Sequence, residues 1–177
     1  LAVLCPEGLH EHSVYDDSRR TLALTLFRGV HRTPTTDGEP GAQVLGTMEF
    51  RYALRPFAGP LPHALILRET MALQAGARIH LAGEPVGRRS FFRLEGSDDI
   101  LVTSVKPGED GCSVVVRLWN TAFEEREAVL QFEPPPKEAM RCNLAEETQG
   151  SLSVFADGVN VGVCARGLAT VRLVFGA

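Results

Sequence analysis

His10-Glu11-His12 is the segment whose residue types and spacing come closest to a metal site. If it forms a strand, both imidazoles point to the same side and could share one zinc ion. No third histidine or cysteine adjoins the segment, and a zinc site also needs partners that orient its ligands. We therefore expect no metal site and no cofactor in this chain.

Two pairs of adjacent acids, Asp16-Asp17 and Asp98-Asp99, supply the kind of carboxylate that glycoside hydrolysis uses. Catalytic carboxylates face each other across a cleft from separate elements, whereas these are neighbours in the sequence. We interpret them as turn-forming residues. The nucleophile motif G-x-S-x-G does not occur. The sequence thus predicts no catalytic residue, and we expect the chain by itself to be inactive.

The charge of the 177-residue chain excludes some classes of partner. Its formal net charge is −4, which argues against a nucleic-acid surface or a basic membrane patch. No apolar run approaches the roughly 18–20 residues that cross a bilayer. The sequence opens with Leu1 rather than methionine and lacks the features of a signal peptide, so we interpret it as a fragment.

The cysteines are scattered, and none forms a C-x-x-C pair that would indicate zinc or a redox site. We predict free, mostly buried thiols, which fit a reducing compartment such as the cytoplasm. The four positions are Cys5, Cys112, Cys142 and Cys164.

Most of the sequence has the patterns of short strands. Hydrophobic residues alternate over 21–28 and over 47–54, where Met48, Phe50, Tyr52 and Leu54 share one face. Asp16-Asp17-Ser18 predicts a hairpin turn, and Pro62 with Gly76 brackets a predicted helix over 62–75. Further strands are predicted at 91–95, 99–106, 112–119, 127–132, 152–156, 160–165 and 168–175. The predicted core includes Val114, Val116, Leu118, Val171, Leu173 and Phe175.

These patterns predict an all-β chain of two parts, with a boundary near 83–90. We assign residues 1–88 to the first part and 89–177 to a terminal antiparallel sandwich. The first part has only a few strands and one helix, so its sheet is short of partners. A sheet of that kind continues in other residues or packs on another domain.

Several segments, in order along nearly the whole chain, resemble glycoside hydrolase family 38 α-mannosidases. They are Gly8-Leu9-His10-Glu11-His12 with Leu22-Ala23-Leu24-Thr25-Leu26-Phe27-Arg28, Pro40-Gly41-Ala42-Gln43 with Phe50-Arg51-Tyr52-Ala53-Leu54, Lys106-Pro107-Gly108-Glu109, Arg117-Leu118-Trp119-Asn120, and Asn143-Leu144-Ala145-Glu146. The resemblance is to the C-terminal β-sandwich region of that family.

The resemblance implies that residues 1–88 end a mutarotase-like supersandwich and that 89–177 are the small terminal sandwich. It places zinc and the catalytic aspartates in an N-terminal barrel domain outside this chain. The partners it implies are the catalytic and helical domains of the same polypeptide and a mannoside substrate. The incomplete sheet of the first part adds a homo-oligomer as an expected form of association. The chain would brace the enzyme that hydrolyses terminal α-mannosides.

The loop after the predicted strand 21–28 holds the candidate substrate-binding residues. Arg28 and Arg32 could donate to sugar hydroxyls or to a carboxylate, and Asp37 lies in the same loop. The alternative for Arg28 is an ion pair at a domain interface. The alternative for the chain is an independent carbohydrate-binding or protein-interaction sandwich. With Trp119 as the single tryptophan, few aromatic side chains are available to stack sugars, and Trp119 itself suits packing.

Overall fold

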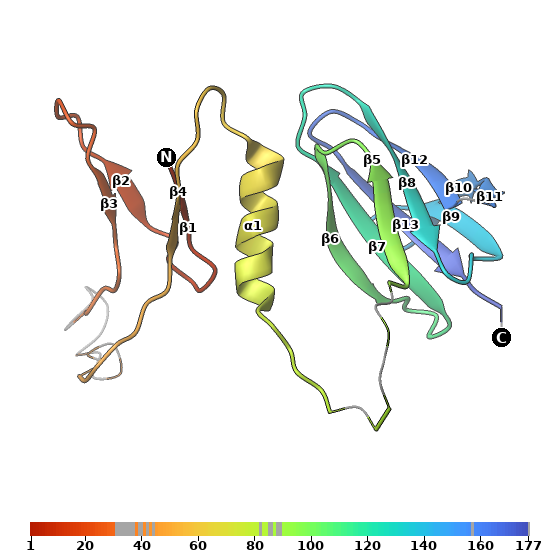
Figure 1. Ribbon diagram of the computed structural model, residues 1–177, viewed down its shortest axis with the longest axis horizontal. Helices are drawn as coiled ribbons and strands as arrows, with labels where there is room; N and C mark the ends of the chain where they lie inside the picture. The colour runs from red at the N-terminus through yellow and green to blue at the C-terminus, as the bar shows by residue number, and fades with distance from the viewer. Residues whose placement is uncertain are drawn as a thin grey trace. The chain divides into compact units, whose positions relative to one another are not determined.

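The computed structural model describes residues 1–30, 38, 41, 43, 45–81, 83, 84, 87, 90–156 and 158–176. Antiparallel strands and one helix make up its regular structure, which confirms the predicted all-β class (Figure 1). The chain divides into two compact units. The first unit comprises Leu1–Pro62 and Ile66–Ala77, and the sandwich unit comprises His63–Leu65 and Arg78–Ala177. The assignment of residues 1–88 and 89–177 to separate domains stays a prediction.

The sandwich unit consists of two antiparallel sheets. The five-stranded sheet has the order β10-β9-β13-β7-β6, and the four-stranded sheet has the order β11-β12-β8-β5 (Figure 1). The strands are β5 (Phe92–Gly96), β6 (Ile100–Pro107), β7 (Ser113–Asn120), β8 (Arg126–Phe132), β9 (Glu138–Cys142), β10 (Thr148–Leu152), β11 (Val154–Phe155), β12 (Gly158–Val163) and β13 (Leu168–Val174).

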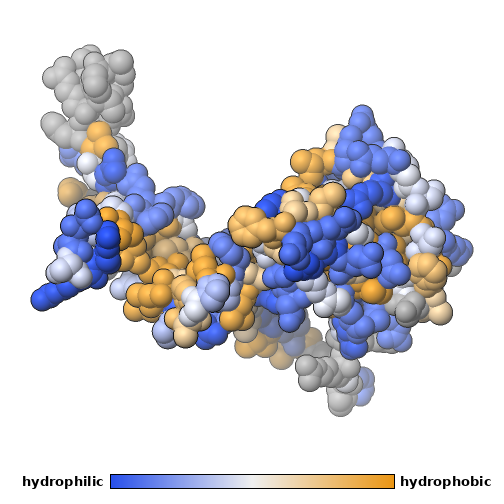
Figure 2. Space-filling view, turned by 90° about the horizontal axis from the view of Figure 1, so that it is seen from above, coloured by the Kyte–Doolittle hydropathy of each residue, from blue (hydrophilic) through white to orange (hydrophobic). Residues whose placement is uncertain are grey.

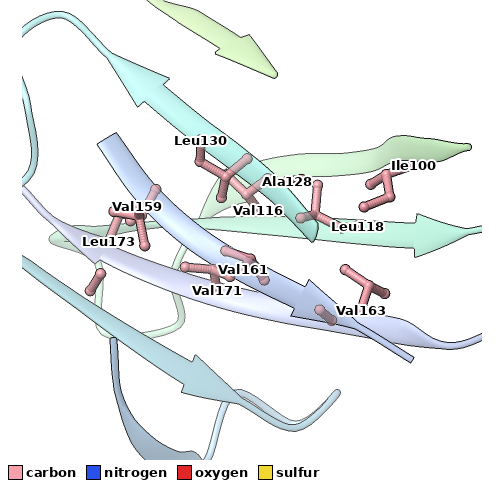
Figure 3. Packing of buried hydrophobic residues seen from close by; sticks show 12 residues of the cluster. Ile100, Val116, Leu118, Ala128, Leu130, Val159, Val161, Val163, Val171 and Leu173 are labelled. Carbon is pink, nitrogen blue, oxygen red and sulfur yellow. The ribbon is translucent and has the colours of Figure 1, made fainter. Parts of the chain in front are cut away.

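Branched aliphatic side chains fill the space between these sheets. Val159, Val161 and Val163 alternate along β12 and are fully buried, as a strand with one face in the core requires. Figure 3 shows them packed against residues of β7 and β13. Of the predicted core, Val116, Leu118, Val171 and Leu173 are fully buried, and Val114 and Phe175 pack on its margin.

Strands β9 and β10 are not predicted by the sequence pattern. The Glu138–Cys142 strand has no regular alternation and is held by its neighbours, β10 on one side and β13 on the other. Arg141 also donates from Nη1 to the carbonyl oxygen of Gly162, 2.8 Å away in the other sheet. The predicted strand 152–156 is correspondingly divided between the end of β10 and β11. Pairing with distant strands thus decides the structure here.

The first unit contains two separate two-stranded sheets. Strand β1 (Ala2–Leu4) pairs with β4 (Ala53–Arg55), and β2 (His12–Val14) pairs with β3 (Leu22–Leu24). Among the described residues of this unit, Leu4 is the one large hydrophobic side chain that is buried. Figure 2 shows hydrophobic residues, in orange, reaching the surface of the molecule. In its described residues, the unit therefore lacks a core of its own.

The turn between β2 and β3 confirms the predicted role of Asp16 and Asp17. The Asp17 carboxylate accepts hydrogen bonds from the backbone N–H groups of Arg19 and Thr21 and from the Thr21 hydroxyl. The bonds from Thr21 are the main reason that the pKa of Asp17 lies below its usual value. Asp16 pairs with Arg20 at 2.7 Å. Both acids are turn residues.

The predicted strands of the first unit are too long. Only residues 22–24 of the segment 21–28 pair, and within 47–54 pairing begins at Ala53. Tyr52 and Leu54 were expected on a buried face but are 54% and 60% exposed. Alternation shows that a segment suits an extended backbone, whereas pairing and burial need a neighbouring surface that is not determined locally.

The predicted helix over 62–75 is confirmed as α1 (His63–Ala75). It ends at Gly76, whose positive φ of 61° suits a residue without a side chain. Ala64 is the helix residue that is buried, so the helix faces are mostly uncovered. In the described part of the chain, no helix combines the length and the apolar character needed to span a membrane.

Candidate functional site

The sequence candidate Arg28 lies beside a shallow surface hollow in the first unit. Its Nη2 donates to Oε2 of Glu11 at 2.7 Å. The hollow has a volume of about 430 Å³ and is lined by His10, Glu11, His12, Ser13, Thr25 and Arg28. The structure thus brings two sequence signals together, the His10-Glu11-His12 segment and the cation that follows β3.

The β2–β3 hairpin positions these groups. His12 is opposite Leu24 in the register, and Thr25 donates from its backbone N–H to the carbonyl oxygen of Glu11 at 3.0 Å. The side chains of Arg28 and Glu11 are 72% and 53% exposed. Solvent screens such a pair, so it contributes at most about 1 kcal/mol to stability.

The hollow is suited to binding a polar or anionic group rather than to holding a metal. A guanidinium has five N–H donors, and the bond to Glu11 leaves others of Arg28 available to a hydroxyl or carboxylate. His10 and His12 provide two imidazoles, fewer than the three protein ligands of a catalytic zinc site. Across the described residues, no group of three histidine, cysteine or acidic side chains could bind a metal ion.

The other two candidates, Arg32 and Asp37, lie outside the described residues. Their assignment as substrate-binding residues stays a prediction. The Arg28–Glu11 pair corresponds to the ion-pair alternative for Arg28, with the carboxylate supplied from within the first unit rather than across a domain interface.

In the sandwich unit, the acids at Asp98-Asp99 lie in the turn between β5 and β6. Asp99 accepts from Nε of Arg126 at 3.4 Å, and the Thr121 hydroxyl donates to the Asp99 carbonyl oxygen at 2.9 Å. Asp99 therefore joins two loops, which agrees with its interpretation as a turn residue.

The cysteines are free, but they are less buried than predicted. Cys142 is buried in β9 and Cys5 is half-buried, whereas Cys112 and Cys164 are exposed. Both exposed cysteines lie in turns. Turns run over the protein surface, so even an apolar side chain there can be exposed to solvent.

A comparison with protein families identifies the sandwich. Residues 99–173, from the turn before β6 into β13, match the family described as the glycosyl hydrolases family 38 C-terminal beta sandwich domain. The sandwich unit is a domain of this family. A search of the curated proteins found no match for the chain. The match thus relates the sandwich unit to the C-terminal domain of family 38 glycosyl hydrolases.

Asn120 is a structural residue of the family 38 sandwich domain whose role the sequence analysis missed. Its fully buried amide donates from Nδ2 to the carbonyl oxygens of Glu124, Val163 and Cys164, at 2.7–3.1 Å. Its Oδ1 accepts from the backbone N–H of Ala122 at 2.9 Å. An asparagine at the end of a hydrophobic strand, as Asn120 is in β7, is a signal for such a loop contact.

Proposed function

We propose that this chain is the non-catalytic C-terminal region of an α-mannosidase. The family of the sandwich domain supports a glycosyl hydrolase, and the resemblance of the shorter segments supports hydrolysis of terminal α-mannosides. In this proposal, residues 1–88 end a supersandwich whose remaining strands lie elsewhere in the polypeptide. The whole region braces the catalytic and helical domains.

The observation that carries this proposal is the difference between the two units. The sandwich unit buries a continuous aliphatic core. The first unit exposes large hydrophobic residues on β4, on α1 and after β3, among them Leu26, Phe27, Tyr52, Leu54 and Leu73. Exposed patches of this kind are typical of surfaces that contact another domain, because water solvates them poorly.

The hollow beside Arg28 supports a contribution to the substrate cleft. We propose that Arg28, Arg32 and Asp37 border a mannoside cleft formed mainly by the catalytic domain. The exposed guanidinium of Arg28 can donate to a sugar hydroxyl without first breaking its bond to Glu11. We include Arg32 and Asp37 in this proposal because they follow β3 in the sequence, in the same loop as Arg28.

The proposal places the catalytic zinc in the barrel domain of the polypeptide, as the family resemblance implies. It also places the protein in the cytoplasm. The free cysteines support this location, because exposed thiols such as Cys112 and Cys164 persist in a reducing compartment.

The test compares hydrolysis of an aryl α-mannoside by the whole polypeptide and by the 177-residue chain, each with and without added zinc. We expect turnover from the whole polypeptide and none from the chain. Zinc-dependent turnover by the purified chain would refute the non-catalytic role. No turnover by the whole polypeptide, together with saturable sugar binding by the chain, would favour an independent carbohydrate-binding module.

A further inference from the structure

One end of the sandwich unit presents an aromatic ring paired with a cation. The guanidinium carbon of Arg166 lies 4.0 Å from the centroid of the Phe123 ring. Phe123 is 79% exposed, although it is a large hydrophobic side chain. Phe123 lies in the loop between β7 and β8, and Arg166 in the turn between β12 and β13. Two loops far apart in sequence thus build one small surface, which we call the Phe123–Arg166 pair.

Backbone contacts hold both loops in place. Asn120 donates to carbonyl oxygens in each of them, as described above. Arg166 itself donates from its backbone N–H to the Ala122 carbonyl oxygen at 2.9 Å. The turn is closed by a bond from Gly167 N–H to the Cys164 carbonyl oxygen at 2.9 Å. The backbone that carries the Phe123–Arg166 pair is therefore held in place by these bonds, which lowers the entropy cost of binding.

The pair is anchored to the rigid core as well. The loops that carry it adjoin the ends of β7 and β12, where Leu118 and Val163 lie in the core (Figure 3). Thr121 ties the same loop to the turn before β6 through two bonds to the Asp99 carbonyl oxygen.

The charges indicate which partner fits. No carboxylate forms an ion pair with Arg166 among the residues that the structure describes. A guanidinium that stacks on a ring still presents its N–H donors at the edge, where they match a carboxylate with two parallel bonds. Aromatic and arginine side chains together are the residues that most often dominate protein–protein interfaces.

A protein partner fits this surface better than a sugar. A sugar stacks on an open aromatic face, and here the guanidinium covers one face of the only aromatic ring at this end that is mostly exposed among the described residues. A protein surface with an aliphatic patch beside an aspartate or glutamate would bury the ring edge and pair with Arg166 in one contact.

We propose that the Phe123–Arg166 pair docks the sandwich unit onto a carboxylate-bearing surface of another domain in the same polypeptide. This inference rests on the proposed function, because it requires that polypeptide to contain further domains. In this proposal, the sandwich unit docks through a specific contact, whereas the first unit docks through its exposed apolar residues.

The test uses the whole polypeptide and the 177-residue chain, each with Phe123→Asp, Arg166→Glu or Arg166→Lys. Hydrogen exchange in residues 121–125 and 164–167 should be about tenfold slower in the whole polypeptide than in the chain. Phe123→Asp and Arg166→Glu should abolish that difference, and Arg166→Lys should retain part of it. The matched control is Phe155→Asp, at the opposite end of β12, which should leave the difference unchanged.

Melting of the 177-residue variants checks that they fold, since both substituted side chains are exposed and their change should leave the midpoint unaltered. Equal exchange in the whole polypeptide and the chain would overturn the proposal. So would perturbation of Phe123 by mannose oligosaccharides in an NMR titration, which would assign the pair to sugar binding. No hydrolysis of an aryl α-mannoside by the unsubstituted whole polypeptide, with the exchange difference intact, would refute the proposed function and leave the docking contact standing.

Discussion

Lys106 and Glu146 form an ion pair in which Nζ lies 2.6 Å from Oε1. Lys106 is in β6, and Glu146 is in the loop between β9 and β10, at a positive φ of 64°. Glu146 also accepts from the backbone N–H of Glu109 through Oε2 at 2.9 Å. The pair connects the edge strand β6 to a loop at the other side of the same sheet. The pair and the bond from Glu109 join two segments that carry the family resemblance.

Acid stability should depend on Glu146. The hydrogen bond from Lys106 and the backbone bond from Glu109 hold the pKa of Glu146 below its ordinary value of 4.5. A lowered folded-state pKa stabilises the native chain above the unfolded pKa, and that stability is lost as pH falls through the folded pKa. We expect the melting temperature of the native chain to fall more steeply below about pH 4.5 than that of Glu146→Gln.

The neighbouring acid provides the control for this experiment. Glu147 accepts from Nδ2 of Asn143 instead of a lysine, so Glu147→Gln should keep the steep acid response. Asp110, whose pKa is lowered to about 2 mainly by backbone N–H groups of Cys112 and Ser113, should keep these hydrogen bonds in all three proteins. Parallel curves for the native chain and Glu146→Gln would contradict the assignment.

The core of the sandwich should not tolerate a charge at Val116. Val116 is fully buried and pairs across the sheet with Val105, which is 53% exposed on the edge strand β6. Val116→Asp buries an unpaired carboxylate and should cost at least about 3 kcal/mol of unfolding free energy. Val105→Asp, at the paired position, should stay within about 0.5 kcal/mol. Urea unfolding measures both, and equal losses would show that Val116 is not in the core.

The sandwich unit should fold by itself. All strands of both of its sheets lie within Phe92–Val174, so residues 88–177 contain the whole core cluster. We expect a single cooperative thermal transition from a polypeptide of residues 88–177, because a small closed core unfolds in one step. A product without a transition would mean that residues before 88 are required for folding.

The 177-residue chain should associate through its first unit. Leu54 lies on β4 and Tyr52 directly before it, and both are mostly exposed. In the part of the chain that the structure describes, β4 pairs with β1 alone. Apolar surface and free strand edges favour dimers or larger assemblies. Sedimentation should show association that Leu54→Lys weakens, while Leu144→Lys, at an equally exposed residue of the sandwich unit, should have no effect. A monodisperse monomer at high concentration would count against the docking role of the first unit.

In the whole polypeptide, the proposed function predicts that Arg32→Ala lowers kcat/KM for an α-mannoside by about tenfold, a loss of about 1.4 kcal/mol, with little change in melting temperature. Arg28→Ala should lower stability by at most about 1 kcal/mol, because its pair with Glu11 is exposed. Steady-state kinetics and thermal melting separate the two effects. Unchanged kinetics in both variants would place the loop away from the substrate.

The features predicted correctly from sequence are those determined by residues close together in the chain. Asp17 forms the β2–β3 turn with groups at most four residues away, and α1 ends at Gly76 as its backbone preference predicts. The positions of Val114, Val116 and Leu118, every second residue of β7, predict one face of the strand because successive side chains point to opposite sides, and Val116 and Leu118 are fully buried.

Other features depend on partners that are distant in sequence. Strand β9 forms because β10 and β13 lie beside it, and Tyr52 is exposed because no strand covers its face among the described residues. Phe123 and Arg166 form one surface only after two loops meet at the same end of the sandwich. The sequence alone determined turns, helix and alternating faces, since these are local. The tertiary structure decided which faces are covered and which side chains meet, because pairing and burial depend on surfaces brought together by folding.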